Sequence, residues 1–136
     1  MTTLKISVPA YHAKIENICT LAGEAAIKAG FDERTAYACQ LAIGEACENI
    51  INHGYKAEGI GDIELSAEIS PGKIVLTLRD SSPPFNPAVE PGPPHWKEED
   101  PPVGGLGLLI IHRVMDQVRY TRTGGKNILE LLKIEK

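Results

Sequence analysis

The spacing of hydrophobic residues changes once along this chain, and that change limits what the chain can fold into. In the first part of the sequence, apolar residues recur at helical spacing. We expect one helix over residues 11–29 and a second from about residue 32 to 53, each ended by a glycine, Gly30 and Gly54. Further along, apolar and polar residues alternate, as they do in strands with one buried face.

The alternating segments predict one separate strand and two hairpins. The separate strand covers residues 3–8. Residues 62–79 form a hairpin around Pro71 and Gly72, because proline presets φ at the second position of a type II turn and glycine accepts the positive φ of the third. Residues 118–134 form a second hairpin, split by a Gly-Gly pair.

The second expected helix has a polar face opposite an apolar one. Glu45 and Asn49 lie one helical turn apart, and Leu41, Glu48 and Asn52 fall on the same side. A carboxylate and an amide oxygen are hard donors, suited to Mg²⁺, to a water molecule or to proton abstraction. Solvated helix faces also carry Glu and Asn, so this segment alone leaves both a functional site and an ordinary polar surface open.

A proline-rich segment separates the two hairpins. Eight of the ten prolines fall between Pro83 and Pro102, and this density excludes the interior of a helix or sheet. A long loop without secondary structure inside a compact domain is usually functional, often a lid. A disordered insertion is the alternative that composition leaves open.

Glycines follow the proline-rich segment and precede an apolar helical pattern over residues 108–115. They form the run Gly104, Gly105, Leu106 and Gly107. Glycines at the start of a helix let the backbone approach a ligand closely, and the helix N-terminus offers free N–H groups to a phosphate. The run is neither a dinucleotide-binding fingerprint nor a Walker A loop. A simple tight turn therefore remains possible.

Bulk properties narrow the function classes. A chain of 136 residues suits one domain with a hydrophobic core. Its net charge of −4 and the absence of a basic block do not indicate nucleic-acid binding. The apolar runs are too short to span a bilayer, and the first 20 residues lack a signal-peptide core, so we expect a cytoplasmic protein without membrane contact. Cys19, Cys39 and Cys47 contain no C-x-x-C pair, which indicates reduced core thiols.

Three motifs in order carry a resemblance to a known superfamily: E-A-C-E-N-I-I-N-H-G-Y at 45–55, R-D-S-S-P-P-F-N-P at 79–87 and G-G-L-G-L-L-I-I-H-R-V-M-D-Q-V-R-Y at 104–120. The chain resembles the ATP-binding domain of gyrase, histidine kinases, heat-shock chaperones and mismatch-repair ATPases (the Bergerat or GHKL fold). Within it, the chain is most similar to the small anti-sigma-factor serine/threonine kinases of bacterial partner switching.

The resemblance implies a fold and a domain layout. The fold is α+β, a two-layer α/β sandwich whose mixed, mainly antiparallel sheet is covered on one face by about three helices. Residues 1–136 then form a single histidine-kinase-like ATPase domain, with the ATP lid at about residues 81–103. The proline-rich segment corresponds to that lid.

The resemblance also implies ATP and Mg²⁺ as cofactors and assigns roles to residues. Glu45 matches the proposed general base, and Asn49 matches the Mg²⁺ ligand that bridges the metal to the phosphates. Asp80 matches the carboxylate that accepts a hydrogen bond from the adenine amino group. The remaining implied nucleotide contacts are Phe85, Gly104, Gly105, Leu106 and Gly107.

The implied function is that of a protein-serine kinase and anti-sigma regulator. Such a protein phosphorylates a STAS-type anti-sigma-factor antagonist, binds a sigma factor, and pairs as a homodimer through the N-terminal strand and first helix. The alternative is an ATP-binding regulatory module that sequesters a protein partner without kinase turnover. Two departures support the alternative: Ser82 replaces a usual glycine, and Val103 and Gly104 replace a further glycine and a basic residue. Serine at position 82 would strain the site or loosen adenine binding if the site needs a positive φ or a close backbone approach there.

Overall fold

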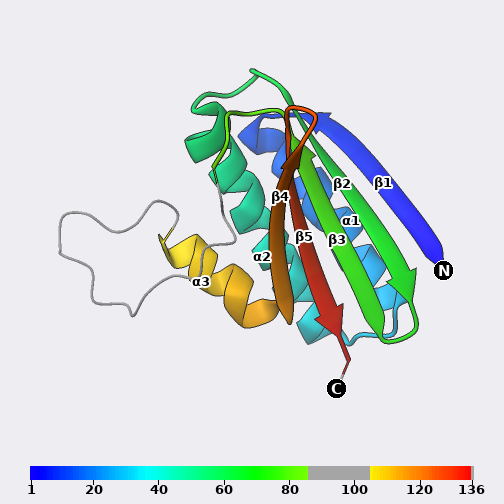
Figure 1. The fold of residues 1–136 in the computed structure, drawn as a ribbon. Helices are drawn as coiled ribbons and strands as arrows, with labels where there is room; N and C mark the ends of the chain where they lie inside the picture. Colours follow the sequence, from blue (N-terminus) through cyan, green and yellow to red (C-terminus); the bar gives the residue numbers. More distant parts are fainter. Residues whose placement is uncertain (86–104, 136) are drawn as a thin grey trace.

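The described residues of the computed structural model, 1–85 and 105–135, form two layers. One layer is a five-stranded sheet, and the other consists of helices that cover one face of it (Figure 1). The α+β sandwich implied by the resemblance is therefore confirmed. The ATP lid expected at about 81–103 lies outside the described residues, apart from residues 81–85.

The sheet has the strand order β1-β2-β3-β5-β4. Every pairing between the described strands is antiparallel, so the sheet is more regular than the mixed arrangement that was expected. Short hairpin turns impose this direction on β2–β3 and on β4–β5. The strands are β1 (Thr2–Pro9), β2 (Asp62–Ser70), β3 (Lys73–Asp80), β4 (Gln117–Thr123) and β5 (Lys126–Ile134).

Both hairpins predicted from the alternating pattern are present, and glycine closes their turns. Gly72 has φ +71°, as the third position of a type II turn requires. Its backbone N–H also donates to the carbonyl of Ala29 at 2.8 Å, which ties this turn to the end of the first helix. Gly30 ends that helix with φ +98°, as expected.

The first expected helix begins later than the sequence pattern indicated. Residues His12–Lys14 form a 3₁₀ turn, η1, and the α-helix α1 covers Ile15–Lys28. The second helix, α2 (Glu33–Asn49), starts where predicted, because the Asp32 side chain accepts a hydrogen bond from the backbone N–H of Thr35 at 2.8 Å.

The end of the second helix differs from the prediction. Its α-helical hydrogen bonding stops at Asn49, and the chain continues as a π-helix, η2 (Ile50–Tyr55). Lys56, with φ +66°, then turns the chain away, so Gly54 does not end the helix. Hydrophobic spacing does not distinguish the wider π turn from an α turn, and π turns often occur at functional sites.

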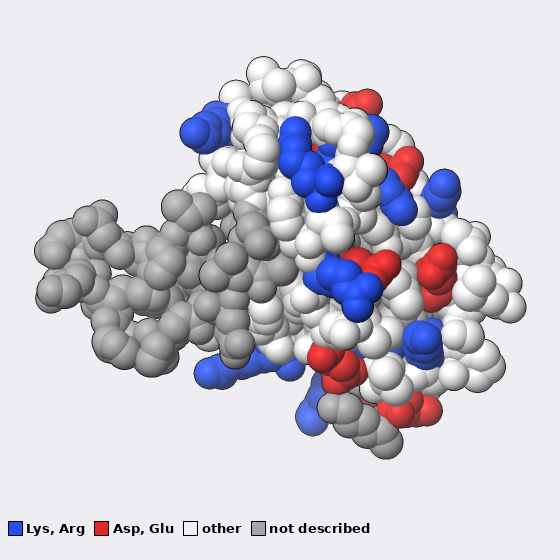
Figure 2. Space-filling model, viewed as in Figure 1, with Lys and Arg blue, Asp and Glu red and all other residues white. Residues whose placement is uncertain are grey.

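The core lies between the sheet and the helices. Ile74, Leu76 and Leu78 point from β3 into this core, since alternate strand residues share a face. Asp80 continues the same series and therefore ends the strand on the buried face. On the opposite face of the sheet, charged side chains of both signs are scattered among uncharged ones (Figure 2).

The cysteines are free thiols, as predicted. Cys39 and Cys47 are buried in the core, whereas Cys19 is partly exposed. Burial raises the pKa of all three thiols, that of Cys39 to about 11. None of the described helices combines the length and apolar character needed to cross a bilayer.

Candidate functional site

Asp80 is held at the end of β3 by hydrogen bonds to one of its two carboxylate oxygens. Only 4% of the residue is exposed. Oδ1 accepts hydrogen bonds from the backbone N–H of Ser82 at 2.9 Å, from the Ser82 hydroxyl at 2.5 Å, and from the Asn127 side-chain amide at 3.0 Å. Buried polar groups are normally hydrogen-bonded in this way. The residue assigned to adenine is thus fixed in place by neighbouring groups.

Ser82 fits this position without the strain that was considered for it. Among the described residues other than glycine, only Lys56 has a positive φ, so the backbone at Ser82 does not require glycine. The serine is 1% exposed, and its hydroxyl donates to Asp80 while accepting from Asn127 at 3.0 Å. A positive φ, the first ground for expecting strain at Ser82, is therefore absent, whereas a close backbone approach, the second ground, stays a prediction.

Asn127 on β5 is the central residue of this network, and the sequence analysis missed it. It lies directly opposite Asp80 in the β3–β5 register. Its amide oxygen accepts hydrogen bonds from Tyr120 at 2.5 Å and from Arg122 at 2.9 Å. Arg122 also donates to the backbone carbonyl of Ser82 at 3.0 Å. Sequence could have indicated Asn127 only after β3 and β5 had been placed side by side.

The polar face of α2 is divided in two. Glu48 is partly exposed and pairs with Nδ1 of His12 at 3.0 Å. Glu45 is half-buried and Asn49 is 6% exposed, and no described residue donates to or accepts from either side chain. Among the described residues of this face, Glu45 and Asn49 are therefore the pair whose side chains make no hydrogen bond or ion pair to another described residue.

The side chain of Asn49 makes no hydrogen bond to another described residue, although only 6% of the residue is exposed. A nearly buried amide without a partner in the described part of the chain is available to a ligand.

The π-helix η2 joins the α2 face to the segment that follows β3. A Cβ placed on Gly54 would lie 2.5 Å from Oγ of Ser82 and 2.9 Å from Cε1 of Phe85, so only glycine allows this approach. The Tyr55 hydroxyl accepts from the backbone N–H of Ser81 at 2.9 Å and donates to the carbonyl of Asp62 at 2.8 Å. Phe85, predicted as a nucleotide contact, thus lies beside the Asp80 network.

The glycine-rich run begins the third helix. Helix α3 covers Gly105–Val114, so Gly105, Leu106 and Gly107 form its first turn, as the helix-opening glycines predicted. Gly104 lies outside the described residues. Helix α3 packs against α2, the helix that carries Glu45 and Asn49 (Figure 1). The fold therefore brings the second and third motifs close to the first.

A family model described as the histidine kinase-like ATPase domain matches residues 8–133. The chain belongs to this family. Serine-protein kinase RsbW of Bacillus mycoides strain KBAB4 is 30% identical over 131 residues, which cover 93% of this chain and 80% of that protein. Serine-protein kinase RsbW of Bacillus licheniformis is 26% identical over 114 residues, covering 80% of this chain and 71% of the relative.

Solved structures of this family share the fold. The RsbU and RsbW domains of Rv1364c from Mycobacterium tuberculosis match with a TM-score of 0.66 and 18% identity, over 98% of this chain. The match covers 32% of that longer chain. The catalytic domain of the histidine kinase ThkA matches with a TM-score of 0.56 and 14% identity, over 99% of both chains. At these identities the structures support the fold alone.

Asn49 is the residue that the resemblance assigned to Mg²⁺. No three His, Cys, Asp or Glu side chains cluster as a metal site within residues 1–85 and 105–135. A nucleotide-bound Mg²⁺ does not need such a cluster, because it takes most of its ligands from phosphates and water and only one or two from side chains. The Asn49 amide, which has no partner among the described residues, fits that limited role.

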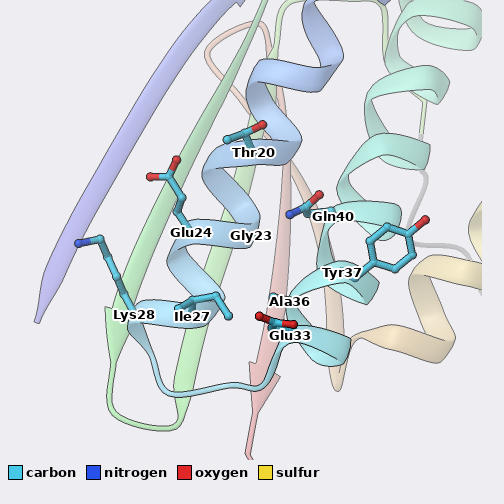
Figure 3. Close-up of a pocket in the computed structure, with 9 residues that line it drawn as sticks. All are labelled: Thr20, Gly23, Glu24, Ile27, Lys28, Glu33, Ala36, Tyr37 and Gln40. Atoms are coloured by element: carbon cyan, nitrogen blue, oxygen red, sulfur yellow. The ribbon is translucent and has the colours of Figure 1, made fainter.

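This family member also has a pocket away from the candidate site, between α1 and α2 (Figure 3). Glu24 and Ile27 of α1 line it together with Glu33, Tyr37 and Gln40 of α2. None of the residues predicted from the motifs lines this pocket. The candidate site is therefore the region around Glu45, Asn49 and Asp80.

Proposed function

We propose that the chain is an ATP-dependent protein-serine kinase and anti-sigma regulator that phosphorylates a STAS-type anti-sigma-factor antagonist. Similarity to proteins named as serine-protein kinases, over most of the chain, supports the reaction class. The site is assigned from the pair Glu45 and Asn49, which lie one turn apart on α2 and have no partner among the described residues. In this proposal the protein also binds a sigma factor, and it acts in the cytoplasm, where both partners and ATP are found.

The proposed ligand is ATP with Mg²⁺. Asp80 accepts a hydrogen bond from the adenine amino group, and Phe85 contacts the nucleotide. Asn49 holds Mg²⁺ together with the phosphate oxygens. The first turn of α3, with Gly105 and Gly107, offers free backbone N–H groups and the positive end of its dipole to the phosphates. Mg²⁺ neutralises the charge that develops on the transferred phosphoryl group.

Glu45 acts as the general base in this proposal. Its carboxylate accepts the proton of the serine hydroxyl on the antagonist as that oxygen bonds to the γ-phosphorus. The bond from the γ-phosphorus to the β,γ-bridging oxygen breaks, and ADP leaves with the electron pair. A half-buried carboxylate without a protein partner suits this task, because nothing in the described structure competes for its oxygens.

The second candidate function is an ATP-binding module that sequesters a partner without turnover. Ser82 gave this alternative part of its support. Because the Ser82 hydroxyl is hydrogen-bonded to Asp80 and its backbone does not need a positive φ, serine no longer gives a conformational reason to expect weak adenine binding. The remaining support is Gly104, where relatives often carry a basic residue ahead of the G-L-G run, and that residue lies outside the described part of the chain.

A homodimer through β1 is part of the proposal. Strand β1 lies at one edge of the sheet, where its outer backbone groups are free to pair with a second copy. Helix α1 contacts β1 and would contribute to the same interface. Light scattering at micromolar concentration tests this proposal, since the mass of a monomer would contradict it.

Phosphate transfer to purified STAS-type proteins of the source organism tests the kinase. Wild type is compared with Glu45→Ala and with Glu48→Ala, which removes a nearby acid that pairs with His12 outside the candidate site. We expect Glu45→Ala to lose transfer by roughly 10²- to 10⁴-fold while ATP still binds, and Glu48→Ala to transfer at the wild-type rate. Transfer by Glu45→Ala at the wild-type rate would reject the assigned base. ATP binding with no transfer to any partner would favour the second candidate.

A further inference from the structure

One oxygen of the Asp80 carboxylate is fully used by the protein. Each carboxylate oxygen offers about two lone pairs, and Oδ1 accepts three donors, two from Ser82 and one from Asn127. The hydrogen bonds that described residues donate to this carboxylate all end on Oδ1. Any further donor that reaches Asp80 must therefore use Oδ2.

The donors on Oδ1 are themselves held in one arrangement. The amide of Asn127 faces a carboxylate on one side and Arg122 and Tyr120 on the other. Only one orientation puts its NH₂ group toward Asp80 and its oxygen toward the other two donors. Ser82 and Asn127 are 1% and 3% exposed, so water does not compete for these bonds. The donors on Oδ1 are therefore already in place before a ligand binds.

Adenine and guanine present different numbers of hydrogen-bond donors to such a carboxylate. On the edge that meets Asp80, adenine carries one donor, the exocyclic amino group, next to the acceptor N1. Guanine carries two neighbouring donors, N1–H and the 2-amino group, which pair with both oxygens of a free carboxylate. If Oδ1 is occupied, one guanine donor is buried without an acceptor, and an unsatisfied buried donor is costly.

We propose that Ser82 and Asn127 select adenine over guanine by occupying Oδ1 of Asp80, so that a purine meets a single acceptor oxygen. The inference rests on the proposed nucleotide site and adds to it the residues that set the choice of base. Neither residue needs to touch the base. Both act through Asp80 and are positioning residues.

The test is the ratio of GTP to ATP dissociation constants, measured calorimetrically with Mg²⁺. The main variant is the double substitution Ser82→Ala with Asn127→Ala, which leaves only the backbone N–H of Ser82 on Oδ1. A second double variant, Ser82→Ala with Asn127→Leu, removes the same donors but keeps the side-chain volume at position 127, so the test stays valid if the smaller side chain disturbs the fold. The matched control is Ser66→Ala, since Ser66 is also buried but bonds Arg79 on the opposite face of the sheet.

We expect the preference of wild type for ATP to fall roughly tenfold in both double variants, mainly because GTP binds better, and to stay unchanged in Ser66→Ala. If Ser82 and Asn127 only stabilise the fold, the variants should bind both nucleotides more weakly and keep the same GTP-to-ATP ratio. That result would overturn the inference. If wild type prefers ATP but the ratio does not move, only this inference fails. If wild type binds neither nucleotide, the proposed function fails with it.

Discussion

The end of β3 and the polar face of α2 both carry candidate site residues, but the protein holds them in opposite ways. Asp80 is surrounded by Ser82 and Asn127, and every donor in that network has an acceptor within the protein. Glu45 and Asn49 have no partner among the described residues. The proposed base-binding end is thus built before any ligand arrives, whereas the proposed phosphate end leaves its polar groups to the ligand and metal.

This comparison separates stability from function. A change in a saturated network removes bonds that exist in the free protein, so it lowers the free energy of unfolding. A change in an unpartnered group removes bonds that form only with the ligand, so it lowers affinity or rate and leaves stability nearly unchanged. The two regions should therefore respond differently to matched substitutions.

Among the effects on nucleotide binding, the largest is expected for Asn49→Ala. We expect Mg²⁺-dependent affinity for ATP to fall by roughly 10- to 100-fold, because the proposed metal ligand is lost. The free energy of unfolding should change by less than about 1 kcal/mol, since the amide has no hydrogen bond to lose within the described protein. Calorimetric titration and thermal unfolding measure both quantities.

Asn52→Ala is the control for that experiment. Asn52 has the same side chain, lies exposed three residues further along, and contacts Glu48 only at 3.5 Å. The Asn52→Ala variant should bind ATP with the affinity of wild type. Equal losses of affinity in both variants would mean that Asn49 has no special role, and the contrast between the two regions would fail.

Gly54→Ala should have the next largest effect, and on stability. The added methyl group would lie 2.5 Å from Oγ of Ser82, so the α2 end and the Asp80 network must move apart. Overpacking of this kind costs about 1–3 kcal/mol. Chemical denaturation measures the loss.

Gly44→Ala, in the preceding helix α2, is the control and should not lower the free energy of unfolding. A Cβ on Gly44 would meet only Sγ of Cys19, at 3.4 Å, which is an ordinary contact. Alanine in a helix interior is more favourable than glycine by about 0.5–1 kcal/mol, so this variant should be as stable as wild type or more so. Equal destabilisation by both substitutions would contradict the close approach at Gly54.

A smaller effect is expected where Tyr55 links the two regions. Tyr55→Phe removes the hydroxyl that bonds the backbone of Ser81 and Asp62, and should cost about 1 kcal/mol of unfolding free energy. Tyr37→Phe is the matched control, because that residue is largely exposed. No difference in stability between the two variants would show that the link is not formed in solution.

The smallest effect concerns the apolar side of α2, where chemistry is not expected. Burial raises the pKa of Cys39 and Cys47, so both remain protonated and unreactive at pH 8. A thiol reagent should modify neither in the native protein and all three cysteines after denaturation. Because the folded pKa is raised, the stabilisation from Cys39 is complete below the ordinary thiol pKa and is lost as pH rises toward about 11. Rapid native labelling of Cys47 would contradict its burial.

Much of the fold followed from residue spacing. The two hairpins and the turn at Gly72 are local features, and short-range alternation with glycine placement was enough to predict them. The change from α2 to the π-helix η2 was not predictable, since both helices place apolar residues on one side at similar spacing.

Among the candidate site residues too, those in local motifs could be predicted and those that depend on long-range contacts could not. Glu45, Asn49 and Asp80 could be predicted as site residues because they lie in short motifs. Asn127 was missed because its importance comes from the sheet order, which sets it opposite Asp80 across 47 residues of sequence. Contacts of this kind depend on which strands are neighbours, and a single sequence does not state that.

Side chains from other elements hold the backbone of residues 81–83 just after β3. Arg122 and Asn127 hold the carbonyl of Ser82, Asn127 also holds that of Pro83 at 3.3 Å, and Tyr55 holds the backbone N–H of Ser81. The path of the chain out of the sheet is therefore decided by side chains from other elements. Insertions, deletions or grafted loops placed after Phe85 need not disturb Asp80, so segments can be exchanged at this position, in evolution or by design, while the Asp80 network is kept.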